Sequence, residues 1–135
     1  MAELNLIVDE KPQRIDALMT WLPRIAVAAA FFGFGYQKFA GDAMWIRVFA
    51  QIGLGQWFRY FTGALQIGGA VLVLVPRTFL FGIGTLSCTM VGAMTFWIVV
   101  AHAPFAAIIP GFVQAALVAV AAPSLLRAAS RRGSG

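Results

Sequence analysis

The chain has 135 residues, of which 61% are hydrophobic and only 11% are charged, and its mean hydropathy is +0.84. Soluble domains carry about 25% charged residues, so this surface is too poor in charge to face water and is expected to face lipid. The net charge of +5 does not indicate nucleic-acid binding, because the basic residues are spread singly along the chain, at the ends of apolar runs.

The N-terminal region divides into a polar leader and a first apolar run. Residues 1–21 carry four acidic residues and are expected to lie on the cytoplasmic side. The run from Leu22 to Ala40 approaches the roughly 20 residues that cross a bilayer, so we expect a retained span rather than a cleaved signal peptide. This run ends in "GFGYQKF", where Lys38 either faces a polar pocket or pairs with Asp42 one turn later.

The long connection that follows predicts a short helix of its own. Its apolar residues repeat with helical spacing, while Arg47 and Gln51 fall on the opposite face. A short amphipathic helix that carries Trp45 suits the headgroup layer, either as a cap on the bundle or as a functional lid.

Three further apolar runs are expected to cross the membrane, at residues 57–75, 79–101 and 105–126. The joints Pro76–Thr78 and His102–Pro104 are short and contain proline, so neighbouring spans must be antiparallel. The predicted fold is therefore all-α: a membrane-spanning antiparallel four-helix bundle over residues 22–126, with a short amphipathic interfacial helix between the first and second spans. Residues 127–135 are expected to form a basic, flexible tail. The predicted packing seams are the small residues Ala26, Ala29 and Gly33 in the first span and Gly84, Cys88 and Gly92 in the third.

The basic residues predict the orientation. Four spans place both termini on one side, with seven basic residues there and three on the other. The positive-inside rule then makes the termini cytoplasmic, in a membrane of the bacterial inner type.

The polar residues of the spans gather in the predicted outer half. The helical phases allow Lys38, Gln66 and His102 to line one outward-opening pocket, because polar groups inside a membrane usually face the bundle interior. The structural alternatives are an interhelical hydrogen bond for Gln66 and contact with interfacial water for His102. The other candidates at this depth are Tyr36, Arg59 and Gln114.

Catalytic motifs are missing from the sequence. One histidine, one cysteine (Cys88) and no carboxylate inside a span cannot form a metal cage or a haem pair within one chain. We therefore expect no metal site, and a protein that is not catalytic on its own.

The order of features resembles the DoxX-like family of small four-span membrane proteins. The resemblance is carried by Arg24, by the "GxxxxKF" pattern at Gly33 to Phe39, by the stretch from Phe49 to Arg77, by "TMVGAM" at Thr89 to Met94, and by His102. It implies quinone-linked or oxidative-stress redox systems, in which such proteins act as small accessory subunits. A quinone headgroup could accept hydrogen bonds from Lys38, Gln66 or His102, with Trp45 or Trp57 stacking nearby. The family often has glutamate where this chain has Gln66, which puts a proton-carrying role in doubt.

Three functions remain open at this point. The first is an accessory subunit that binds a lipid-like ligand such as quinone and assists a redox-protein partner. The second is a small transporter or permease that acts as a homo-oligomer. The third is a membrane anchor or assembly chaperone without a ligand.

Overall fold

The computed structural model describes the backbone of residues 2–134 and the side chains of residues 14–134. Within these residues every regular element is helical, which confirms the expected all-α fold. In chain order the elements are α1 (Ala2–Phe39), α2 (Ala43–Ile52), α3 (Gln56–Leu74), α4 (Phe79–Thr95), the π-helical turn η1 (Phe96–Val100), the 3₁₀ turn η2 (Pro104–Ala107) and α5 (Ile108–Gly133).

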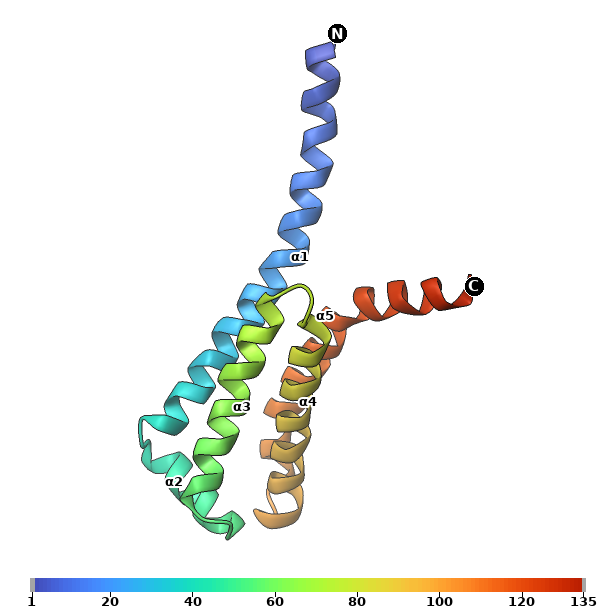
Figure 1. The fold of residues 1–135 in the computed structure, drawn as a ribbon. Helices are drawn as coiled ribbons and strands as arrows, with labels where there is room; N and C mark the ends of the chain where they lie inside the picture. The colour runs from blue at the N-terminus through green and yellow to red at the C-terminus, as the bar shows by residue number, and fades with distance from the viewer. Residues whose placement is uncertain (1, 135) are drawn as a thin grey trace.

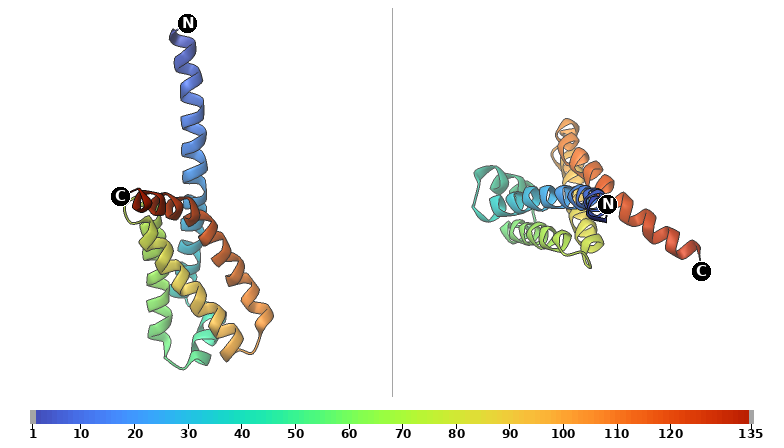
Figure 2. Two further views of the ribbon diagram at one scale, coloured as in Figure 1. Left: turned by 90° about the vertical axis from the view of Figure 1, so that its right-hand side faces the viewer. Right: turned by 90° about the horizontal axis from the view of Figure 1, so that it is seen from above.

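The four long helices α1, α3, α4 and α5 alternate in direction, and both chain termini leave from the same end (Figure 1). We call this the terminal end; it also holds the connection between α3 and α4. The opposite end holds α2, η1 and η2, and we call it the α2 end. The first part of α1 continues beyond the other helices, and the last part of α5 turns sideways (Figures 1 and 2).

One apolar core joins the four long helices, and α3 lies between α1 and α4. The phenyl ring of Phe31 and the side chains of Val73, Leu86 and Leu117 are almost completely buried. The remaining core residues are Ala28, Ala70, Phe79, Ile83, Met90 and Ala121. The outward faces of the same helices expose many large apolar side chains, as a surface in contact with lipid requires.

Three helical stretches in the described chain are long and apolar enough to cross a membrane: Arg14–Phe39, Phe79–Val100 and Pro104–Gly133. The expected second span, residues 57–75, forms α3 but is not among them. Its helix carries Gln56, Arg59 and Gln66, which lower its hydropathy. The side chains of Arg59 and Gln66 are buried against neighbouring helices, so these two polar residues of α3 would not face lipid. The prediction of four spans is therefore supported for three of them.

Close helix contacts depend on glycines that the sequence pattern did not single out. A Cβ atom at Gly63 would lie 3.2 Å from the carbonyl oxygen of Gly35, so α1 and α3 approach closely there. A Cβ atom at Gly82 would lie 2.6 Å from the backbone nitrogen of Val73 and 2.9 Å from the carbonyl oxygen of Gly69. These pairs bring α1 against α3 and α3 against α4, as small residues do in lipid.

The predicted seams were wrong in their choice of face. Gly33, Gly84 and Gly92 have no atom within 4 Å of an added Cβ, and Cys88 is exposed. Residues four apart share a helix face, but the spacing does not say whether that face meets a neighbouring helix or lipid.

The short helix between the first and second spans is confirmed as α2. The carboxylate of Asp42 accepts a hydrogen bond of 3.0 Å from the backbone N–H of Met44, which caps the first turn. Gly53 ends the helix in the left-handed conformation, with φ of 79°. The phenyl ring of Phe49 is buried, so one face of α2 packs onto the helices beneath it.

Candidate functional site

Lys38 and Gln66 form a buried hydrogen bond between α1 and α3 at the α2 end. Lys38 lies in the last turn of α1, and its Nζ donates to Oε1 of Gln66 over 2.7 Å. The two residues are 4% and 3% exposed. Gly63 provides the room, because a Cβ there would lie 3.3 Å from Cβ of Lys38. The lysine side chain therefore passes along α3 and reaches the amide of Gln66, about one helical turn beyond Gly63.

Helix α2 covers this pair through Trp45. The Nζ atom of Lys38 lies 4.1 Å from the centroid of the Trp45 ring, a cation–π contact. The indole N–H donates to Oε1 of Gln37 over 3.4 Å, which orients the ring. A second bond of 3.3 Å, from Nε2 of Gln56 to the carbonyl oxygen of Ile46, ties α2 to the start of α3.

Arg59 is buried about two turns before Gln66 in α3, nearer to the α2 end, and it caps α1. Its Nη1 donates to the backbone carbonyl of Lys38, one of the last carbonyls of α1, which lack partners within the helix. Nε donates to Oε1 of Gln56 over 2.9 Å, and Nη2 donates to the hydroxyl of Tyr60 over 2.9 Å. The partial negative charge at a helix C-terminus favours a cation in this position.

Both buried cations donate hydrogen bonds to neutral groups. Of the five acidic residues, only Asp42 follows residue 16, and its carboxylate caps α2. Lys38 bonds the Gln66 amide, so the local pairing of Lys38 with Asp42 that the sequence allowed is not the arrangement found. The structural alternative for Gln66, an interhelical hydrogen bond, is the arrangement that the structure has.

The structure brings together Lys38, Gln66, Arg59 and Trp45, and it places the other candidates elsewhere. The side chains of Tyr36 and Trp57 are each 63% exposed. His102 is exposed in the connection between η1 and η2, with a positive φ of 49°. No hydrogen bond joins it to Lys38 or Gln66 in the described residues. A pocket shared by Lys38, Gln66 and His102 stays a prediction.

Gln114 lies on the core-facing side of α5, on the same helix face as Pro110, Leu117 and Ala121. Its Oε1 is buried and has no hydrogen-bond partner within the part of the chain that the structure describes. A buried amide oxygen without a donor is costly, so this atom is a place where a hydroxyl or a water would be stabilised.

Three polar residues of the site were missed by sequence reasoning. Gln37, Gln56 and Tyr60 hold Trp45 and Arg59 in place. A signal for Gln56 was present, because it precedes Arg59 by three residues and so shares its helix face. Gln37 and Tyr60 lie next to the candidates Lys38 and Arg59. Which of two neighbouring residues faces the bundle interior depends on how the helix is rotated.

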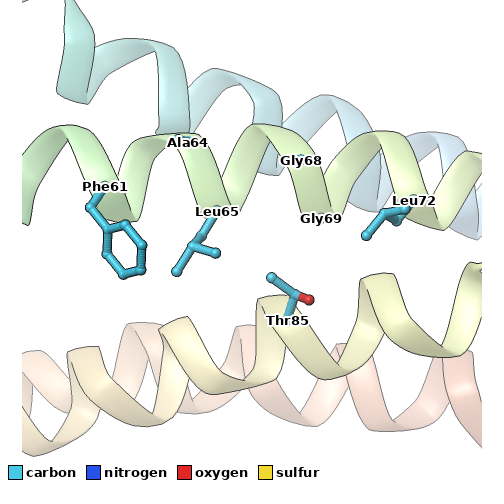
Figure 3. Close-up of a pocket in the computed structure, with 7 residues that line it drawn as sticks. All are labelled: Phe61, Ala64, Leu65, Gly68, Gly69, Leu72 and Thr85. Carbon is cyan, nitrogen blue, oxygen red and sulfur yellow. The ribbon is translucent and has the colours of Figure 1, made fainter.

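The two best-formed cavities are shallow apolar grooves on the sides of the helices. One, of about 270 Å³, lies between α3 and α4 and is lined by Phe61, Ala64, Leu65, Gly68, Gly69, Leu72 and Thr85 (Figure 3). The other, of about 420 Å³, lies between α1 and α3. Neither groove is lined by Lys38 or Gln66.

The described residues contain no group of three histidine, cysteine or acidic side chains that could hold a metal ion. The residues of the α2 end offer hydrogen-bond donation from two buried cations, together with aromatic contact.

Comparison with known proteins identifies a family. A model of the DoxX-like family matches residues 23–121, which is more than half of the chain. No curated protein and no solved structure matches. The match covers α2, α3 and α4 and most of the packed parts of α1 and α5, including the polar cluster. The chain is therefore a membrane protein that belongs to the DoxX-like family.

Proposed function

We propose that this protein is an accessory membrane subunit of a redox system, either quinone-linked or responding to oxidative stress, and that it binds a lipid-like ligand such as quinone at its α2 end. The observation that carries the proposal is the buried Lys38 ammonium, which lies between the Gln66 amide and the Trp45 ring. Buried ionisable groups among membrane helices usually mark functional sites.

The donor chemistry suits a quinone headgroup. An ammonium has three N–H donors, and Lys38 uses one of them on Gln66. A ligand carbonyl would take another, and the Trp45 ring would stack on the headgroup. Gln114 is proposed as a separate acceptor on α5, where a ligand hydroxyl would satisfy its buried oxygen.

Helix α2 is proposed as the lid through which the ligand enters. It is short, and Gly41 and Gly53 flank it with positive φ of 78° and 79°. Changes at these two glycines would let α2 lift as a unit and uncover Lys38. The alternative of a fixed cap predicts that crosslinking α2 to α3 leaves ligand binding unchanged.

The proposed topology is a bundle of four spans in a bacterial inner membrane, with cytoplasmic termini. In this topology α3 is the second of the four spans, because its Arg59 and Gln66 side chains are buried against other helices rather than facing lipid. Labelling of single cysteines at Ser130 and Arg47 from either side of sealed vesicles would test the orientation.

The ligand is tested by mass spectrometry and ultraviolet spectroscopy of the protein purified in mild detergent. We expect a retained quinone, and binding of an added alkyl-benzoquinone that quenches tryptophan fluorescence. Lys38→Met should weaken this binding about 10- to 100-fold, because a charged hydrogen bond is lost. Arg47→Gln is the matched control, since Arg47 is an exposed cation at the same end. No retained ligand together with equal binding by both variants would reject the proposal.

The anchor or assembly role is favoured by a different observation. The groove between α3 and α4 (Figure 3) and the bare stripe Gly84, Cys88 and Gly92 leave α4 open to close approach by another membrane helix. This role predicts that Gly84→Leu abolishes crosslinking to a membrane partner while Lys38→Met does not. The reverse result would favour the ligand-binding role. Transport as an oligomer remains a prediction that solute uptake into proteoliposomes would test.

A further inference from the structure

The last part of α5 leaves the bundle at Pro123. Proline removes a backbone donor and clashes with the preceding turn, so it bends a helix. After the bend, the helix points sideways at the level of the terminal end, away from the other helices (Figures 1 and 2). It continues to Gly133 and exposes Leu125 (51%) and Leu126 (71%), so it is helical without packing against the core.

The bend lies close to the level at which the bundle ends. Gly111 faces Met94, because a Cβ there would lie 3.8 Å from the methionine sulfur. Pro123 lies 12 residues after Gly111, and Gly82 lies 12 residues before Met94. Because α4 and α5 run in opposite directions, Pro123 and Gly82 are at about the same level, and Gly82 is in the first turn of α4. The sideways segment therefore begins about one turn, or 5 Å, inside the end of α4.

Other residues at this level have the character of a membrane interface. The guanidinium of Arg24 lies 4.0 Å from the centroid of the Phe79 ring and 5.6 Å from that of Trp21. Tryptophan and arginine gather where the apolar core of a bilayer meets the headgroups. The sideways segment is thus at headgroup depth when the core helices cross the membrane.

The segment has two unlike faces. Arg127 and Arg131 are four residues apart and share one face, while Leu125 and Ala129 lie on the opposite face. Arg132 is a third cation; it follows Leu125 by seven residues and therefore lies on the Leu125 side of the helix, in its last turn, where its long side chain can extend to the headgroups. Helix α5 contains no acidic residue to pair with the three arginines.

We propose that residues 123–133 form a surface helix that binds the anionic phosphate groups of the lipid leaflet at the terminal end. Leu125, Leu126 and Ala129 enter the boundary of the acyl chains, and the three arginines contact the headgroups. The occupant is lipid rather than a soluble anion because the apolar face needs an apolar layer at the same depth. Each arginine is expected to raise affinity for an anionic surface about fivefold.

The test uses the full chain with Cys88→Ala, because Cys88 is exposed and would react. Ala129→Cys then carries an environment-sensitive fluorophore on the apolar face. The protein is reconstituted into vesicles of phosphatidylcholine alone or with about one-third phosphatidylglycerol, at roughly 0.1 M and 1 M salt, where the screening lengths are about 10 Å and 3 Å.

We expect the fluorophore to be shielded from a neutral aqueous quencher in the phosphatidylglycerol vesicles. Shielding should be lost in pure phosphatidylcholine, at high salt, and in the triple variant Arg127→Gln, Arg131→Gln, Arg132→Gln. Arg47→Gln, at the other end of the molecule, should keep it. Added inorganic phosphate should not displace the segment if lipid is the source of the anion. Equal shielding in both vesicle types, or full shielding in the triple variant with unchanged circular dichroism, would overturn the proposal.

Discussion

At the α2 end, α1 and α3 are joined by polar groups: Lys38 bonds Gln66, and Arg59 bonds the carbonyl of Lys38. Towards the terminal end, α3 and α4 are joined by close contact at Gly69 and Gly82, with Val73 and Leu86 buried beside them. The first kind of contact needs particular partner atoms, whereas the second needs only the absence of side-chain volume. A region held by polar groups can exchange them for those of a ligand, and a region held by backbone contact cannot.

The largest effect is expected at the glycine contact. Gly82→Ala places a Cβ 2.6 Å from the backbone nitrogen of Val73, so α4 must shift and the free energy of unfolding should fall by about 2–3 kcal/mol. Gly84→Ala is the control, because its Cβ meets open space and alanine favours a helix by about 1 kcal/mol. Unfolding in detergent measures both variants. Equal costs at the two positions would show that the contact does not hold the terminal end.

A smaller loss is expected from Lys38→Met at the polar end. The change leaves Oε1 of Gln66 buried without a donor, which costs about 1–3 kcal/mol. The double variant with Gln66→Leu should recover part of this loss, because neither partner is then unsatisfied. A double-mutant cycle on unfolding free energies measures the coupling, and strictly additive effects would mean that the pair contributes nothing as a pair.

Trp45→Leu should have a more modest effect, about 1 kcal/mol, because the cation–π contact to Lys38 is lost while apolar burial is largely kept. Trp57→Leu, at a position 63% exposed, should change the unfolding free energy little. Hydrogen exchange of the α2 amides should also increase in the first variant and not in the second. Equal exchange in both variants would show that the stability of α2 does not depend on the contact between Trp45 and Lys38.

The smallest effect is expected at Asp42. Asp42→Ala removes the cap of α2 and should cost about 0.5–1 kcal/mol, while Asp42→Asn should stay within a few tenths because its side-chain oxygen can still cap. Thermal unfolding followed by circular dichroism is sufficient. A clear loss in Asp42→Asn would indicate that the carboxylate charge interacts with Lys38 after all.

The sequence indicated which polar residues lie within the apolar runs, but not how they are arranged. Lys38, Arg59 and Gln66 stood out because ionisable and amide groups are rare in apolar runs. Their depth followed from helical rise, but their partners depend on how α1 and α3 are rotated against each other. His102 illustrates the difficulty: it follows the third apolar run, but its left-handed backbone and its exposure could not be read from the sequence.

Composition and periodicity alone determined that this chain is an all-helical membrane protein with a short helix after the first span, because burying backbone polar groups in lipid leaves few alternatives. The tertiary structure decided which glycines meet, which cation bonds Gln66, and that α5 turns sideways after Pro123. The physical reason is that residues with helical spacing can lie on any face of a helix, and the depth of a polar residue does not say toward which neighbour it points. Only the packed neighbours select the face that is used.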